Sequence, residues 1–219
     1  MMTLVHGRVR LALYALRDNA GPHLLLLHGL GERSPEQVPA AVASWRGAVH
    51  ALDLTGHGAS TVPSGGGYSC EVMMADVDAA LAVLGPCTIL GRGLGGYVGL
   101  LIAGARPTLV RGLIIDDGPG LAGGGVRPGS TTITVPDASV LGRLGTTPDP
   151  YALLELSNDV RPPDYAESFV RLALQGPLDE PISVCSVARP PWLAAVAGSF
   201  GVRTESLASA LARLAVLES

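Results

Sequence analysis

The sequence predicts an α/β protein built on a mostly parallel sheet, and two observations carry this prediction. Short apolar runs alternate with helix-like segments along most of the 219 residues, which is typical of strands joined by crossover helices. The run Leu24-Leu25-Leu26-Leu27 is continuously apolar, as expected of a parallel strand buried on both faces. The expected strands are Leu4–Val9, Leu11–Leu16, His23–Leu27, Ala48–Leu52, Cys87–Leu90, Gly112–Ile115 and Pro181–Val187.

The first two expected strands follow one another directly, so they predict a hairpin-like antiparallel pair. The later strands are separated by helical segments, which predicts parallel pairing. We therefore expect a mixed sheet.

The first helix is expected to begin at Ser34 and to run to about Trp45. Ser34 would be the N-cap, Pro35 the first helical residue, and Gln37 would complete a capping box three residues after the cap. Further helices are expected over Ser69–Leu84, from Gly95 to before Pro107, and over Pro150–Asn158, Pro163–Gln175 and Thr204–Leu217.

Gly, Pro and Thr crowd the stretch from Gly118 to Gly145, where the periodicity fails. A chain of this length predicts one domain with an insertion rather than two domains. We therefore expect a core of residues 1–117 and 178–219, with a small cap or lid over 118–177.

Composition narrows the classes of function. Hydrophobic residues make up 47% and charged residues 16%, and the net charge is −4, so nucleic acid is not an expected partner. No signal peptide or membrane-spanning run is present, which predicts a cytoplasmic protein. The three cysteines have neither disulfide-like nor metal-like spacing. The basic residues are all Arg, and with abundant Gly this is typical of a GC-rich bacterial genome.

Two glycine-rich motifs each follow an expected strand. The first is His28-Gly29-Leu30-Gly31, and the second runs from Asp53 to Ser60 with the sequence DLTGHGAS. In this order and position they resemble the α/β-hydrolase superfamily, most clearly over Leu4 to Asp117. The resemblance implies an α/β-hydrolase-like fold and an oxyanion hole with the Leu30 N–H as one donor. His28 and His57 are expected to be turn-forming residues with satisfied ring nitrogens; a role as bases is the other interpretation, but neither has an identifiable nucleophile to serve.

The resemblance also requires a nucleophile elbow of the form Gly-x-Ser-x-Gly. Here the segment reads Gly91-Arg92-Gly93-Leu94-Gly95-Gly96, so Gly93 stands at the nucleophile position. A glycine has no attacking atom for covalent acyl transfer. Arg92 beside it is expected either to offer a cation to a carboxylate ligand or to form a structural ion pair.

The other triad members are also missing from their expected places. The five histidines all lie at or before His57. Directly after the strand Pro181–Val187, where the acid often sits, the segment Ala188-Arg189-Pro190-Pro191-Trp192 contains no carboxylate. We also expect the last strand to be lost, which shortens the C-terminal end and leaves an open sheet edge. Asp117, with its neighbour Asp116, resembles the family's alternative acid position; a turn-capping role is the other interpretation.

The elbow satisfies a second pattern. Gly91-x-Gly93-x-x-Gly96 follows a strand and opens a helix, and Asp116 lies 20 residues beyond Gly96, as in a dinucleotide-binding fingerprint. The position of the motif weakens this dinucleotide-binding interpretation, because such a fingerprint normally lies in the first βαβ unit.

Three hypotheses follow. The first is a catalytically silent hydrolase fold without a confident catalytic residue, which binds a small ligand or a protein partner. The second is an enzyme of non-triad mechanism, a lyase or weak esterase or thioesterase, that uses the Leu30 and Leu94 N–H groups. The third is dinucleotide binding. No cofactor, metal, nucleic acid or membrane is expected. The open sheet edge leaves three alternatives, a homodimer, a heteromer or an edge that is blunted without a partner. The expected ligand-binding residues are His28, Gly29, Leu30, Arg92, Gly93 and Leu94.

Overall fold

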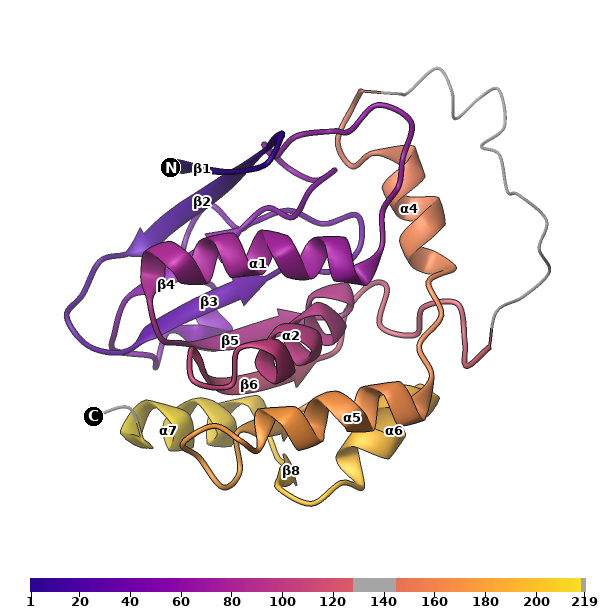
Figure 1. The fold of residues 1–219 in the computed structure, drawn as a ribbon. Coiled ribbons are helices and arrows are strands. Elements are labelled where there is room, and N and C mark those ends of the chain that lie inside the picture. The colour runs from indigo at the N-terminus through magenta and orange to yellow at the C-terminus, as the bar shows by residue number, and fades with distance from the viewer. Residues whose placement is uncertain (128–144, 218–219) are drawn as a thin grey trace.

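The computed structural model describes residues 1–127 and 145–217, and it contains an eight-stranded sheet (Figure 1). The order across the sheet is β1-β2-β4-β3-β5-β6-β7-β8. β1 pairs antiparallel with β2, and β2 with β4, while the other pairs are parallel. The expected mixed sheet and N-terminal hairpin are confirmed. The strands are β1 Met2–His6, β2 Val9–Arg17, β3 His23–Leu27, β4 Val49–Leu52, β5 Cys87–Arg92, β6 Val110–Asp116, β7 Ile182–Val184 and β8 Val202–Thr204.

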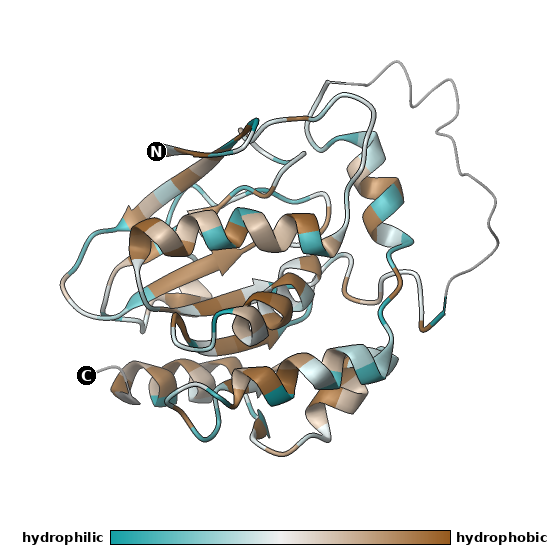
Figure 2. Ribbon diagram, in the orientation of Figure 1, coloured by the Kyte–Doolittle hydropathy of each residue, from teal (hydrophilic) through white to brown (hydrophobic). Residues whose placement is uncertain are grey.

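The central strands are buried on both faces, as the apolar run in β3 predicts. Leu25 and Leu27 belong to one apolar cluster, and Leu24 and Leu26 to a second cluster on the opposite face. β3 is hydrophobic after its first residue, His23, and most of the strand is brown in Figure 2.

Helices cover both faces of the sheet. α1, α2, α4, α5 and α6 contribute to the first apolar cluster and α7 to the second, and α1 and α2 cross the front of the sheet in Figure 1. The α1 start is confirmed, because the Ser69 side chain accepts a hydrogen bond from the Val72 N–H. The helices are α1 Cys70–Leu84, α2 Leu94–Ala105, α4 Pro150–Ser157, α5 Pro163–Ala173, α6 Pro191–Ala197 and α7 Leu207–Leu217.

The expected first helix is wrong. Over that stretch the structure has one short 3₁₀ turn, η1 Ala40–Val42. The Ser34 N–H donates to the Asp53 carboxylate at 2.7 Å, and the buried Ser34 hydroxyl has no partner and caps nothing. Pro39 then interrupts the segment in an extended conformation (φ −59°, ψ 143°), so a tertiary contact and a proline override the local capping signal.

The expected loss of the last strand is also wrong. β8 is only three residues long, but it pairs in parallel with β7, after a helix, α6, that the sequence analysis did not predict. The edge of the sheet is therefore a short strand instead of a gap, and short edge strands limit edge-to-edge pairing.

Part of the expected cap, residues 128–144, lies outside the described residues. Among the described residues of the expected cap, those of α5 pack against α2 and α6. The division into core and cap stays a prediction.

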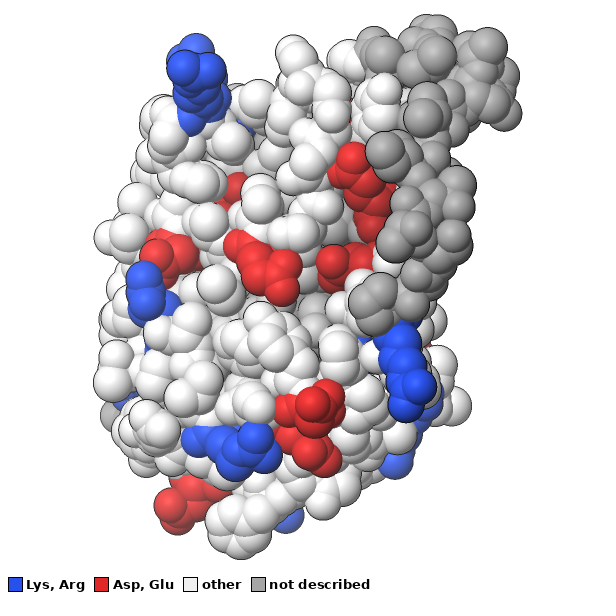
Figure 3. Space-filling model, turned by 45° about the vertical axis from the view of Figure 1, so that its right-hand side comes forward, with Lys and Arg blue, Asp and Glu red and all other residues white. Residues whose placement is uncertain are grey.

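Within the described ranges, no helix is both long and apolar enough to cross a membrane. The face in Figure 3 carries acidic and basic side chains in small separate groups, without a continuous basic area.

Candidate functional site at the β5–α2 turn

The turn from β5 into α2 has the sharp geometry of an elbow, with Gly93 at its apex. Gly93 has φ +53° and ψ −115°, a conformation that favours glycine. A Cβ atom placed on Gly93 would lie 2.1 Å from the Pro119 carbonyl oxygen and 2.7 Å from that of Gly118. The space above Gly93 that a nucleophilic side chain would need is therefore filled by the backbone after β6.

The two predicted oxyanion-hole donors do converge on one point. The Leu30 N–H donates at 3.0 Å and the Leu94 N–H at 2.9 Å, both to the Pro119 carbonyl oxygen. These distances match those of an oxyanion hole to the oxygen that it binds. One of the chain's own backbone carbonyl groups therefore accepts from both of the expected donors.

The segment that enters the hole, Gly118–Leu121, is called here the occluding loop. Its far end is held by Arg161, whose Nη1 donates to the carbonyl oxygens of Gly120 (2.7 Å) and Leu121 (2.8 Å), and by Trp192, whose Nε1 donates to Leu121 at 2.8 Å. Arg161 is fully buried and its guanidinium lies 4.5 Å from the centre of the Tyr97 ring. Charge-assisted hydrogen bonds to carbonyl groups in a buried site are strong, so the loop is firmly anchored.

His28 and His57 form turns, as the sequence predicts. His28 Nε2 accepts from the Leu54 N–H at 3.1 Å, and His57 Nε2 accepts from the Gly31 N–H at 3.1 Å. The other ring nitrogen of each contacts a backbone carbonyl and must therefore be the donor. Burial lowers the pKa of both, that of His57 to about 4. Both rings are neutral and fully bonded, so neither is available as a base.

The sequence predicts two alternative roles for Arg92, a cation for a carboxylate ligand or a structural ion pair, and the structure has the ion pair. Its Nη1 lies 3.0 Å from both carboxylate oxygens of Glu32. Glu32 also accepts from the Gly29 N–H at 2.9 Å, which ties the first glycine-rich turn to β5.

Asp117 has a turn-capping arrangement. Its carboxylate accepts hydrogen bonds from the Ser186 hydroxyl and from the N–H groups of Val187 (2.8 Å) and Ala188 (3.1 Å). These bonds, that from Ser186 foremost, hold the pKa of Asp117 below its usual value. A carboxylate with three local donors stabilises the loop after β7.

Three N–H groups of the turn already have backbone partners and are not free to bind a phosphate. Those of Gly93, Leu94 and Gly96 donate to the carbonyl oxygens of Asp116, Pro119 and Gly93. Phosphate binding at a helix start depends on N–H groups without a protein partner, so the geometry does not favour dinucleotide binding. In the described part of the chain, no group of three or more His, Cys, Asp or Glu residues could hold a metal ion.

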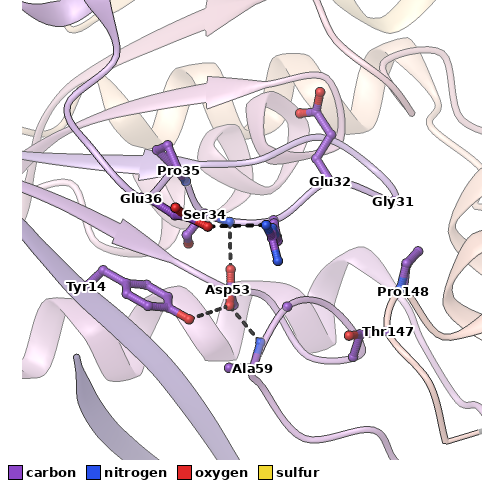
Figure 4. Close-up of a pocket in the computed structure, with 12 residues that line it drawn as sticks. Tyr14, Gly31, Glu32, Ser34, Pro35, Glu36, Asp53, Ala59, Thr147 and Pro148 are labelled. Atoms are coloured by element: carbon purple, nitrogen blue, oxygen red, sulfur yellow. Dashed lines mark hydrogen bonds and ion pairs between the residues drawn. The ribbon is translucent and has the colours of Figure 1, made fainter.

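Two clefts lie beside the occluded hole. The first, of about 510 Å³, surrounds Asp53, whose carboxylate accepts from the Ser34 and Ala59 N–H groups and from the Tyr14 hydroxyl (Figure 4). The second, of about 440 Å³, lies on the face of the sheet that carries the second apolar cluster, between β3, β5 and the start of α7. Glu32 and Ser34 line both clefts.

A model of the alpha/beta hydrolase family matches residues 24–217, which is most of the chain. The chain belongs to the alpha/beta hydrolase family. A curated relative in Stutzerimonas stutzeri, named "Putative carbamate hydrolase RutD", is 35% identical over 115 residues. That match covers 50% of this chain and spans only 40% of the relative's length.

Solved structures agree with this alpha/beta hydrolase fold. The thioesterase domain from the curacin biosynthetic pathway is 18% identical with a TM-score of 0.62, and covers 99% of this chain and 97% of its own. Est1E from Butyrivibrio proteoclasticus, solved with ferulic acid, is 17% identical with the same TM-score and coverage. At these identities the likeness shows the fold alone.

Sequence reasoning missed Pro119 and Arg161. The glycine- and proline-rich stretch at Gly118–Gly120 does signal a departure from the sheet. A backbone carbonyl has no side-chain signature, however, and a lone Arg in a helix–helix connection is ordinarily a surface residue.

Proposed function

We propose that this member of the alpha/beta hydrolase family is catalytically silent as a serine hydrolase and binds a small ligand. The observation that carries the proposal is the Pro119 carbonyl oxygen, which accepts both oxyanion-hole hydrogen bonds at 2.9–3.0 Å. A substrate carbonyl would need the same two donors. Gly93 adds no nucleophile, and the hydrogen bonds of His28 and His57 leave no base beside the turn.

A non-triad mechanism would use the same Leu30 and Leu94 donors, so it would require displacement of the occluding loop. That displacement breaks two hydrogen bonds at the hole and opposes the anchoring by Arg161. The structure thus favours the silent interpretation over the weak esterase.

The test measures hydrolysis of short-chain p-nitrophenyl esters by the purified protein and by Leu30→Pro, which lacks one of the two donors and is first shown to fold by circular dichroism. We expect both proteins to give only background hydrolysis, and a fluorophosphonate probe for activated serines to leave the chain unmodified. Turnover by the parent that Leu30→Pro loses, or covalent labelling of a serine, would show a working site and contradict the proposal.

A further inference from the structure

The 440 Å³ cleft is lined in part by the segment for which the sequence predicts a first helix that the structure does not have. Where a helix would cover the sheet, the chain has only the short turn η1 and extended residues around Pro35 and Pro39. Two leucines of the central strands are left slightly exposed on this face, Leu26 at 8% and Leu90 at 5%. With Val42 and Leu207 they give the cleft an apolar floor and wall.

The position of the cleft in the topology is one where ligands bind. From β3 the chain moves to β4 on one side, and it returns through α1 to β5 on the other side of β3. The cleft lies against the carboxyl ends of the neighbouring strands β3 and β5. In open α/β sheets, ligands bind at this kind of switch point, and 440 Å³ is in the range of small-molecule pockets.

The charged side chains at the mouth of the cleft indicate which charge a bound ligand would carry. Arg92 is matched by Glu32 at 3.0 Å, and Arg33 by Glu36 at 3.4 Å. Asp116 lies beside Arg92 in the register of β5 and β6 and lines the cleft. Among the described residues, the Asp116 carboxylate has no hydrogen-bond or ion-pair partner. The charges that line the cleft balance in number, Glu32 and Asp116 against Arg33 and Arg92, but Asp116 is the lining carboxylate that no described arginine pairs with.

We propose that this cleft binds an organic cation with an apolar body, an alkyl or aryl ammonium, whose nitrogen pairs with Asp116 and whose body covers Leu26 and Leu90. The inference rests on the proposed function, because it names the ligand class of a protein proposed to bind without hydrolysing. The other cleft does not fit this ligand equally well, since Asp53 already accepts three hydrogen bonds from the protein.

The experiment titrates the full chain with phenethylammonium and, as matched probes, with the neutral 2-phenylethanol and the anionic 3-phenylpropionate, by calorimetry at low salt. We expect the ammonium to bind more tightly than either matched probe. Asp116→Asn should weaken ammonium binding about tenfold, the share of one charge-assisted hydrogen bond. Asp78→Asn, on the opposite face of the sheet in α1, is the control and should bind like the parent.

A second variant tests the apolar contact. Leu207→Gln, at the partly buried start of α7, should weaken both the ammonium and the neutral probe. Equal ammonium affinity in the parent and in a folded Asp116→Asn variant would overturn the assignment to Asp116. Stronger binding of the neutral or anionic probe would overturn the cationic class but leave a ligand-binding protein. Binding of no probe would overturn the site, while the ester assay tests catalytic silence independently.

Discussion

Arg161 is predicted to be the main anchor of the occluding loop, so replacing it should cost far more stability than replacing an exposed arginine. Arg161→Met keeps most of the buried apolar volume but removes both hydrogen bonds to Gly120 and Leu121. Each charge-assisted bond contributes about 1.5–3 kcal/mol, and the contact with Tyr97 adds about 2 kcal/mol.

The cost of burying the cation in the parent offsets part of this sum. The nearby Asp159, 3.9 Å from Arg161 Nε, loses its cation in the variant. The net loss on breaking such a buried arrangement is about 3–5 kcal/mol, which lowers Tm by roughly 10 °C in a chain of this size.

The assay is urea unfolding at pH 7, followed by circular dichroism. Arg106→Met is the matched control, because Arg106 forms a bidentate pair with Asp78 that is about half exposed. Such a surface pair contributes about 0–1 kcal/mol. If Arg161→Met and Arg106→Met lower the free energy of unfolding by the same amount, the anchoring role is refuted.

Three further predictions concern the same region. Gly93→Ala should lower the free energy of unfolding by more than about 1 kcal/mol, since φ is +53° and the new Cβ meets the Pro119 oxygen; urea unfolding at the parent's stability would contradict this. Tyr68→Phe should cost about 1–2 kcal/mol in urea unfolding, because the Tyr68 hydroxyl donates to Asp149 at 2.6 Å in a buried site; a loss below 0.5 kcal/mol, roughly the lower limit for a hydrogen bond, would exclude it. The pKa of His57 is lowered to about 4, so the unfolded chain binds more protons there and stability falls as the pH drops from 6.5 toward 4. Between pH 7 and 4.5 the parent should lose about 2 kcal/mol more than His57→Gln, which cannot titrate; parallel pH profiles of urea unfolding would rule out this linkage.

Much of the fold is local in origin. The structure reproduces the bounds of the apolar strand His23–Leu27 and of the expected helix Ser69–Leu84 within a few residues. The glycines of the β5–α2 turn predict an elbow, and an elbow is present. Strand periodicity, helix caps and turn residues act over a few positions, so the sequence shows them directly.

The sequence predictions are wrong where contacts between residues far apart in the chain determine the local structure. The Ser34 backbone N–H donates to Asp53, which follows β4, and the Ser34 hydroxyl caps no helix. β8 is a strand because β7 offers it hydrogen bonds.

The sequence by itself determined the family resemblance, the mostly parallel sheet and the glycine at the elbow. Only the tertiary structure decided what fills the oxyanion hole. Leu30, Leu94 and Pro119 come from three separate turns, and the carbonyl that joins them belongs to the backbone, which every residue shares. Its position depends on Arg161 and Trp192 far along the chain. A pattern of side chains cannot encode such a contact locally, and this is why the occupied hole and the neighbouring cleft emerged only in three dimensions.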